Sequence, residues 1–320
     1  MRSLTLLAAS AAVAALACVS LLTGVSDVSV SALLAGELSD RVWTVLMVSR
    51  VPRTLALILA GASMAVAGLI MQMLARNRFA EPSTVGTVES ASLGLLTVTL
   101  LAPAAPVFGK MLVAAVFALA GTGLFLVILS RLPLRSALIV PLVGLMLGGV
   151  IDAITTFFAY RFDLLQSLAA WTTGDFSGVI QGRYELLWIA FALTVIACLV
   201  ADRFTIAGMG RDLAVNLGLA YWRIVTLGLV VVALVTATVV VSVGVIPFLG
   251  LIVPNIVSLI MGDNLRRSIP WVALSGAGLV LACDIVGRTI RAPYEIPIGT
   301  VVGVVGSAIF LYLLLRQRHA

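Results

Sequence analysis

The stretch at residues 224–262, IVTLGLVVVALVTATVVVSVGVIPFLGLIVPNIVSLIMG, contains no Asp, Glu, Lys or Arg. An α-helix needs about 20 apolar residues to cross the hydrocarbon core of a bilayer, so this stretch is long enough for two crossings. Gly244, Pro247 and Gly250 interrupt it near the middle. Residues of these types break helices, and they predict two membrane helices, the second one short and containing Pro254.

The composition of the whole chain favours the same architecture. Of its 320 residues, 62% are hydrophobic and 11% are charged, against about 25% charged residues in soluble domains. A water-soluble globule is therefore excluded. Charges are avoided at mid-bilayer, so the charge-poor stretches mark the spans. We expect an all-α, polytopic membrane protein with one domain over residues 1–320 and about ten transmembrane helices at 3–26, 54–75, 90–109, 111–130, 136–160, 186–201, the two halves of 224–262, 268–283 and 296–315.

The orientation of the chain depends on its first apolar stretch, which is either a cleaved signal peptide or a retained helix. Its apolar core continues to Leu22, beyond the usual length of about 7 to 15 residues for a signal peptide core, and this favours a retained helix. An even number of spans places both termini on one side. The loops on that side hold more arginines than the opposite loops, which predicts that both termini are cytoplasmic.

Several kinds of chemistry are missing from the sequence. The net charge of +6 is not gathered into a basic run with interleaved aromatic residues, so a nucleic-acid partner is not expected. Cys18, Cys198 and Cys283 lack metal-binding spacing, and the only histidine is His319. We therefore expect no metal site, no catalytic residues and no enzymatic activity.

No phosphate-binding loop of the form GxxxxGK[ST] is present, and Lys110 is the only lysine. Such a loop needs its lysine to reach the phosphates of a bound nucleotide. If ATP drives this protein, a separate ATPase subunit must bind it.

Three acids fall inside or beside the predicted spans. Carboxylates inside a membrane mark ion pathways by default, so a proton-coupled secondary transporter that uses Asp152 or Glu89 is an alternative function. Local pairing is the other interpretation. Asp284 precedes Arg288 by one helical turn, and Glu89 lies at a predicted helix start, where the helix dipole favours an anion. For Asp152 the residues leave both interpretations open.

A segment at residues 204–220 follows the sixth predicted span on the cytoplasmic side. It predicts a short helix at about 211–217 between Gly210 and Gly218. A short surface helix of this kind is either a mechanical coupling element or an amphipathic connector.

Seven short motifs occur in order along the chain, from SRVPR near the start of the second span to YEIPIG before the last one. Together they closely resemble the FecCD-type iron-siderophore and cobalamin permeases of type II ABC importers. The motifs are SRVPR (49–53), GLIMQ (68–72), RNRFAEP (76–82) with Gly86, the glycine-flanked loop at 210–218, FLGLIVPN (248–255), GD (262–263) and YEIPIG (294–299).

The resemblance implies a set of partners. It implies a dimeric permease, with a second copy or a related subunit, in a cytoplasmic (inner) membrane. It also implies two cytoplasmic ATPases that bind ATP and Mg²⁺, and a periplasmic or lipoprotein binding protein that delivers a ferric siderophore. This chain itself would hold no cofactor.

The resemblance also implies roles for individual residues. Arginines that dock the binding protein through its glutamates match Arg50, Arg53 and Arg288, with Arg291 as a further candidate. The cytoplasmic gate matches Asn77 and Phe79. The residues expected to contact the ATPase are Gly210, Arg211, Asp212, Asn216 and Gly218.

The central pathway of such permeases runs along the fifth and tenth spans. Here those spans contain spaced glycines, which either line the pathway or serve ordinary helix packing. They are Gly144, Gly148, Gly299 and Gly303.

Two local features refine the resemblance. Gly86-Thr-Val-Glu-Ser-Ala91 and the pair Pro254-Asn255 are more similar to the catecholate-siderophore branch than to the cobalamin branch. In the coupling loop, Arg211-Asp212 departs from the acidic residues of many relatives, which leaves the individual ATPase contacts open.

Overall fold

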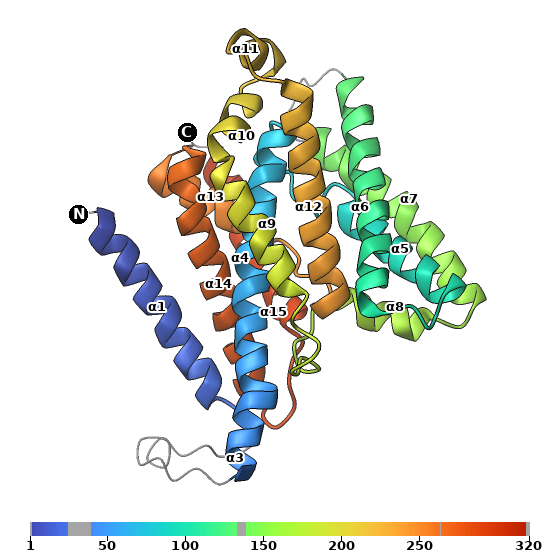
Figure 1. Ribbon diagram of the computed structural model, residues 1–320, viewed down its shortest axis with the longest axis vertical. Coiled ribbons are helices and arrows are strands. Elements are labelled where there is room, and N and C mark those ends of the chain that lie inside the picture. The colour runs from blue at the N-terminus through green and yellow to red at the C-terminus, as the bar shows by residue number, and fades with distance from the viewer. Residues whose placement is uncertain (1, 25–39, 133–138, 263, 318–320) are drawn as a thin grey trace.

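The computed structural model describes residues 2–24, 40–132, 139–262 and 264–317 (Figure 1). No strand occurs among these described residues. The regular elements are α1 (Arg2–Leu22), α3 (Asp40–Val45), the π-helical turn η1 (Leu46–Arg50), α4 (Val51–Leu74), α5 (Thr87–Leu101), α6 (Val107–Ser130), α7 (Ile139–Arg161), α8 (Leu165–Thr172), α9 (Leu187–Leu199), α10 (Ala201–Gly208), α11 (Arg211–Asn216), α12 (Tyr221–Val243), α13 (Leu249–Met261), α14 (Leu265–Thr289) and α15 (Ile298–Gln317).

The predicted spans correspond to helical segments in chain order. Within the described ranges, six segments are long and apolar enough to cross a bilayer, and α9 with α10 forms a seventh that is bent by 68°. The helices α5, α13 and α15 are shorter but also apolar. Together these segments account for the ten expected spans, and the predicted all-α membrane fold is confirmed.

The helix α4 forms the centre of the bundle, with α9, α12, α13 and α14 packed around it (Figure 1). Two close helix crossings explain how so many neighbours fit. A Cβ atom at Gly68 would overlap the carbonyl oxygen of Gly250 on α13, and a Cβ at Gly61 would lie 2.8 Å from the carbonyl oxygen of Gly276 on α14. Small residues at both crossings let the backbones approach, as is common in membrane helix pairs.

The second span begins earlier than predicted, because its arginines do not end the helix. The helical run extends without a break from Val42 to Leu74. A proline ring at position 52 would clash with the carbonyl group of Val48 in a regular α-helix. The turn η1 resolves this clash, and the freed Val48 carbonyl accepts a hydrogen bond from the Gln181 amide at 2.9 Å.

Two other predicted boundaries are wrong for related reasons. The third span ends at Leu101 instead of residue 109, because Pro103 and Pro106 lie in the turn before α6. The ninth span continues to Thr289 instead of ending at residue 283, because Asp284 is paired inside the protein.

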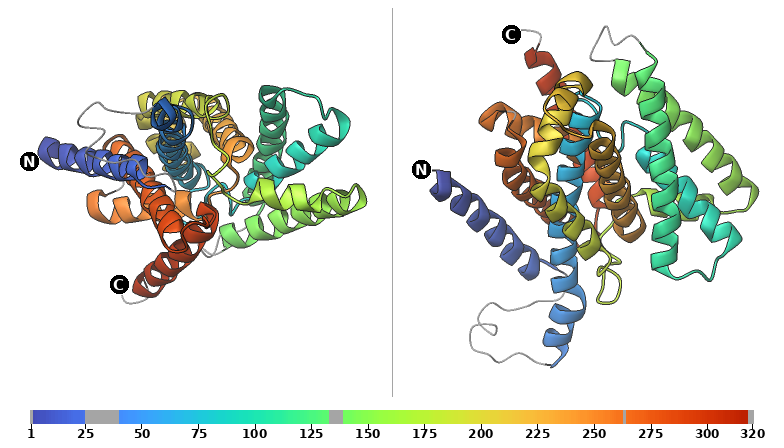
Figure 2. Two further views of the ribbon diagram at one scale, coloured as in Figure 1. Left: turned by 90° about the horizontal axis from the view of Figure 1, so that it is seen from below. Right: turned by 45° about the horizontal axis from the view of Figure 1, so that its top comes forward.

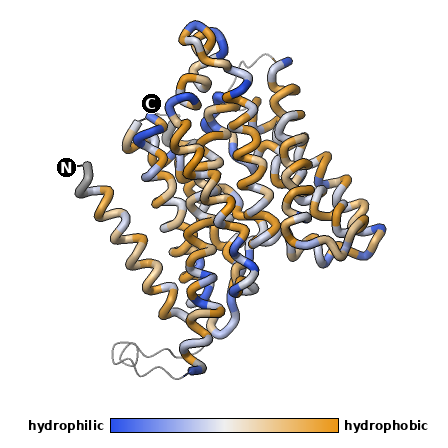
Figure 3. Tube along the Cα trace, viewed as in Figure 1, coloured by the Kyte–Doolittle hydropathy of each residue, from blue (hydrophilic) through white to orange (hydrophobic). Residues whose placement is uncertain are grey.

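The polar segments gather at the two ends of the bundle, whereas its middle is apolar (Figure 3). The helix α11 protrudes at one end, and α3 lies at the opposite end (Figure 1). The helix α1 lies at the edge of the bundle, with its start away from the other helices, and contacts mainly α14 (Figure 2). Two short helices, α3 and α8, lie between the predicted spans.

Candidate functional site

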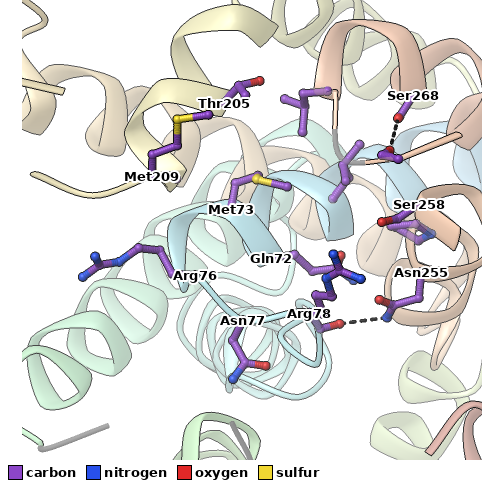
Figure 4. Close-up of a pocket in the computed structure, with 15 residues that line it drawn as sticks. Gln72, Met73, Arg76, Asn77, Arg78, Thr205, Met209, Asn255, Ser258 and Ser268 are labelled. Atoms are coloured by element: carbon purple, nitrogen blue, oxygen red, sulfur yellow. Dashed lines mark hydrogen bonds between the residues drawn. The ribbon is translucent and has the colours of Figure 1, made fainter. Parts of the chain in front are cut away.

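The connection between α4 and α5, residues 75–86, contains both predicted gate residues and is called the gate loop below. Asn77 is buried, and its Oδ1 atom accepts a hydrogen bond from the Phe79 amide at 2.8 Å. The Nδ2 atom of Asn255 on α13 donates to the Arg78 carbonyl at 2.8 Å (Figure 4). The gate loop is thus folded on itself and attached to α13.

Three aromatic rings meet beside the gate loop. The ring of Phe79 lies edge-on to Phe310 of α15, with 5.9 Å between centroids. Phe310 in turn stacks on Phe248 at 6.5 Å. Phe248 has a left-handed backbone conformation, with φ of 61°, at the start of α13. Three separate segments therefore contribute to one apolar cluster beside the gate loop.

Glu81 is a gate-loop residue that sequence reasoning misses. Its side chain is buried, and it accepts hydrogen bonds from the Phe248 amide at 3.1 Å and from the Ser83 hydroxyl. The first amide groups of a helix lack partners within the helix, and a carboxylate there satisfies them and suits the helix dipole. Glu81 therefore caps α13 from a distant part of the chain. The sequence did contain one indication of it, because Glu81 is the acid within the motif at 76–82.

A cavity of about 360 Å³ opens between the gate loop and α10, α13 and α14. Figure 4 shows Thr205 and Met209 on one side of it and Asn255 and Ser268 on the other. The amide of Gln72 reaches across the same region and donates to the Gly250 carbonyl at 3.3 Å. The walls thus combine polar and apolar groups at the end of the bundle from which α11 protrudes.

The predicted short helix between Gly210 and Gly218 is present as α11, and Gly210 precedes it with φ of 120°. Residues 204–220 around it are called the coupling segment below, after one of the two roles predicted for them. The exposed residues of α11 include Arg211, Asp212, Asn216 and also Gly218 beyond its end, whereas Ala214 faces inward. The structure therefore presents most of the residues expected to contact an ATPase on one protruding surface.

That surface is also apolar, because Leu213, Val215 and Leu217 are 44%, 54% and 59% exposed. Nearby, the guanidinium of Arg211 lies 6.0 Å from the ring centroid of the exposed Trp222. An apolar surface that protrudes from a polar end of the molecule is typical of a protein interface.

The coupling segment contacts the gate loop directly. A Cβ atom at Gly210 would lie 3.2 Å from Nη1 of Arg76, the residue that begins the turn after α4. A Cβ at Gly208 would lie 3.1 Å from the sulfur of Met73, near the end of α4. The residues 208–210 therefore lie beside both the end of α4 and the start of the gate loop.

At the opposite end of the bundle, four charged residues form a network. The guanidinium of Arg53 lies 2.7 Å from Asp284 and 2.7 Å from Glu295. Arg288 lies 2.5 Å from Asp284, so the predicted pairing over one helical turn is confirmed. The Asp284 side chain is almost completely buried between the two arginines.

The four arginines predicted to dock a binding protein differ in accessibility. Arg50 is buried and donates to the Leu21 carbonyl at 2.7 Å, and Arg288 is buried and donates to the Thr23 carbonyl at 2.9 Å. Both arginines thus satisfy free carbonyl groups at the C-terminal end of α1. Arg291 is exposed beside Tyr294. The docking role itself stays a prediction.

The four glycines predicted along the pathway lie on α7 and α15. Gly144 contacts the backbone of the gate loop at Thr84, and Gly299 donates to the Gly174 carbonyl at 2.9 Å. Gly148 faces the Glu89 side chain, and Gly303 faces Pro247. Close packing explains the glycines at positions 144 and 299. A role in lining the pathway stays a prediction for all four glycines.

Comparison with known proteins assigns this architecture to a family. Residues 12–316 match the FecCD transport family. The chain belongs to this family. One similar relative is the petrobactin import system permease protein YclN of Bacillus subtilis (strain 168), which is 50% identical over 303 residues, or 95% of each chain. Another is the ferric-anguibactin transport system permease protein FatD of Vibrio anguillarum, which is 39% identical over 282 residues, or 88% of this chain and 90% of that one.

A solved structure shares the fold of this FecCD permease. It is an inward-facing conformation of a metal-chelate type ABC transporter, with a TM-score of 0.81, 22% identity and coverage of 98% of this chain and 99% of that one. Family and fold establish a multi-pass membrane permease subunit of a transporter and not an enzyme. They favour an ATP-driven importer over the proton-coupled alternative.

Proposed function

We propose that this FecCD permease pairs with a second permease subunit to form the channel of an ATP-binding-cassette importer. The channel carries a ferric siderophore from a binding protein across the cytoplasmic membrane. Two partner ATPases bind the ATP and Mg²⁺ that power it. Relatives named for petrobactin and anguibactin support a ferric siderophore as the cargo.

The observation that carries the proposal is the contact between the coupling segment and the gate loop. Arg76 of the gate loop packs against Gly210 at the start of α11. When ATP draws two ATPases together, force on the exposed side of α11 would reach Arg76 and then the aromatic cluster around Phe79. Such rigid-body coupling is a common way to switch a transporter between two arrangements.

The two ends of the bundle fit the two proposed partners. The end with α11 would face the cytoplasm, and the start of α1 and the end of α15 lie toward that end (Figure 1). Both termini would then be cytoplasmic. The opposite end carries the exposed Arg291, whose planar guanidinium group suits bidentate bonds to a glutamate of a periplasmic or lipoprotein binding protein. Arg53 lies at the same end but is engaged by Asp284 and Glu295.

The test is uptake of radioactive iron chelates into proteoliposomes that contain the permease, its ATPase and its binding protein. We expect uptake that requires ATP and persists when the proton gradient is collapsed. Uptake without ATP that disappears with the gradient would overturn the proposal and favour a carrier that uses Asp152 or Glu89. Comparing a catecholate chelate with a hydroxamate chelate decides the narrower prediction of a catecholate cargo.

A further inference from the structure

Two acids that are far apart in sequence line one cavity. Glu89 lies in the first turn of α5, and Asp152 lies in the middle of α7. Both border a cavity of about 390 Å³ that is closed on another side by α8 and is called the acidic cavity below. Glu89 and Asp152, from different helices, thus share one cavity between α5 and α7.

One face of α7 is shaped to receive the Glu89 side chain. Gly148, Asp152 and Thr156 are spaced by four residues, so they lie on the same face of the helix. A Cβ atom at Gly148 would lie 3.3 Å from Cδ of Glu89 and 3.4 Å from its Oε2. The absent side chain at Gly148 thus leaves room for the carboxylate of Glu89 next to Asp152.

Two polar atoms at the acidic cavity have no hydrogen-bond partner in the protein. They are Oε2 of Glu89 and Oγ of Ser92. Ser92 is 5% exposed and lines the cavity one helical turn after Glu89. An unpaired buried polar group destabilises a protein, so such groups in native proteins commonly bind a ligand or water.

The remaining lining residues do not neutralise the two acids. The side chains of Thr156 and Thr172 add hydroxyl groups, and none of the described lining residues is Arg, Lys or His. The described residues also contain no group of three or more His, Cys, Asp or Glu that could hold a metal ion. Two carboxylates with hydroxyl groups and no third ligand suit an organic cation better than a tightly held metal.

We propose that the acidic cavity binds a cationic group of the cargo, a protonated amine, during passage through the membrane. This inference rests on the proposed function, because it takes the passing molecule to be an organic metal chelate. Glu89 and Asp152 would attract the ammonium group, and the Ser92 hydroxyl would accept one of its protons in a hydrogen bond. Chelates that carry amines would then pass this permease more readily than neutral or anionic ones.

The first test measures the electrostatic potential of the cavity. Thr156 is exposed at its edge, and Thr156→Cys is introduced into a full-length chain whose Cys18, Cys198 and Cys283 are replaced by alanine. In proteoliposomes, the cysteine reacts with a trimethylammonium-ethyl or a sulfonatoethyl methanethiosulfonate. The ratio of the two rates is divided by the same ratio for a free thiol.

We expect this normalised ratio to be about tenfold or more, because a carboxylate about 10 Å away at an effective dielectric constant of about 50 changes the rates of the two oppositely charged reagents about threefold in opposite directions. In the double variant Glu89→Gln with Asp152→Asn it falls to about one. The matched control Asp163→Asn, in the turn after α7, keeps the parent ratio. A parent ratio near one, or a cysteine that no reagent reaches, would overturn the proposal.

The second test measures binding of the cation itself. The rate at which the uncharged methyl methanethiosulfonate modifies the same cysteine is measured in the presence of millimolar spermidine, Mg²⁺ or mannitol. We expect spermidine to slow the reaction at least about threefold, and only when Glu89 and Asp152 are present. Equal protection by Mg²⁺, or none by spermidine, contradicts an amine site. Neither test requires transport, so its result is separate from success or failure of the uptake experiment.

Discussion

The guanidinium of Arg53 bridges Asp284 and Glu295, at 2.7 Å from each carboxylate. Asp284 also holds Arg288, so a single buried carboxylate compensates two arginines. Removing one partner of a buried ion pair leaves an unpaired charge in a region of low dielectric, which is strongly destabilising. This network therefore fixes the end of the bundle where α1, α4 and α14 meet.

We expect Asp284→Asn to destabilise the permease by about 3 kcal/mol, because both arginines lose their shared countercharge. Thermal unfolding in detergent, followed by the loss of the monodisperse species, measures the effect. Glu295→Gln is the matched control, since the Glu295 side chain is 30% exposed and exposed pairs contribute about 1 kcal/mol or less. Equal losses for both variants would show that Asp284 is not the central charge.

Binding-protein docking is best tested at Arg291, which is exposed. Reversing the charge of Arg50 would also break its hydrogen bonds to the end of α1. A loss of docking could then not be distinguished from a loss of folding. We expect Arg291→Glu to weaken binding of the binding protein at least about tenfold while the thermal stability stays unchanged. Arg291→Lys keeps the charge but lacks the planar fork, so its affinity for the binding protein should lie between those of the parent and Arg291→Glu. Unchanged affinity in Arg291→Glu would exclude this residue from the docking surface.

The sequence predicts those parts of the fold that depend on local signals. Gly244 and Pro247 predict the break between α12 and α13, and Gly210 predicts the start of α11. Charges were poorer guides to helix ends, because Arg50 and Asp284 find partners inside the protein that are 29 and 231 residues away. Long-range pairs of this kind cannot be deduced from one sequence.

The same limit explains what was missed at the candidate site. Glu81 meets Phe248 across 167 residues, and nothing in the local sequence indicates that a loop acid caps a distant helix. Likewise, Glu89 and Asp152 look like separate acids until α5 and α7 are packed together. The resemblance to FecCD permeases supplied the predicted gate roles of Asn77 and Phe79, which no local pattern indicates.

Glu81 offers a direct test of the attachment between the gate loop and α13. Glu81→Ala leaves the first amides of α13 without their cap, so we expect a loss of about 1 to 2 kcal/mol in stability. We also expect ATP hydrolysis to continue with reduced chelate uptake, because the gate loop loses one of its attachments to α13 while the Asn255 bond remains. Glu81→Gln retains an acceptor oxygen and should keep most of both activities.

The control for that experiment is Ser83→Ala, which removes only the hydroxyl that donates to Glu81. Its uptake should stay close to that of the parent. If Glu81→Ala retains full uptake per ATP hydrolysed, Glu81 stabilises the fold without linking the gate loop to α13.

The exposed side of α11 is expected to bind the ATPase. Replacing Leu213 and Val215 by Asp puts two charges on an apolar surface and should weaken ATPase binding by tenfold or more, equivalent to at least about 1.4 kcal/mol. Copurification and stimulated ATP hydrolysis measure the effect. The control Asp163→Asn lies in the turn after α7, outside the expected ATPase contacts, and should change binding little. Normal assembly of the double Asp variant would exclude α11 as the coupling surface.

The close crossing of α4 and α13 gives the final prediction. A Cβ atom at Gly68 would overlap the backbone of Gly250, whereas a Cβ at Gly123 on α6 meets no atom within 4 Å. We expect Gly68→Ala to force the helices apart and to lower the stability by about 1 to 3 kcal/mol. Gly123→Ala should be neutral or stabilising by up to about 1 kcal/mol, because alanine favours helix. The helix α13 also carries the contacts of Glu81 and Asn255 to the gate loop. Gly68→Ala should therefore reduce uptake more than its loss of stability alone explains. Uptake per folded transporter measures this difference.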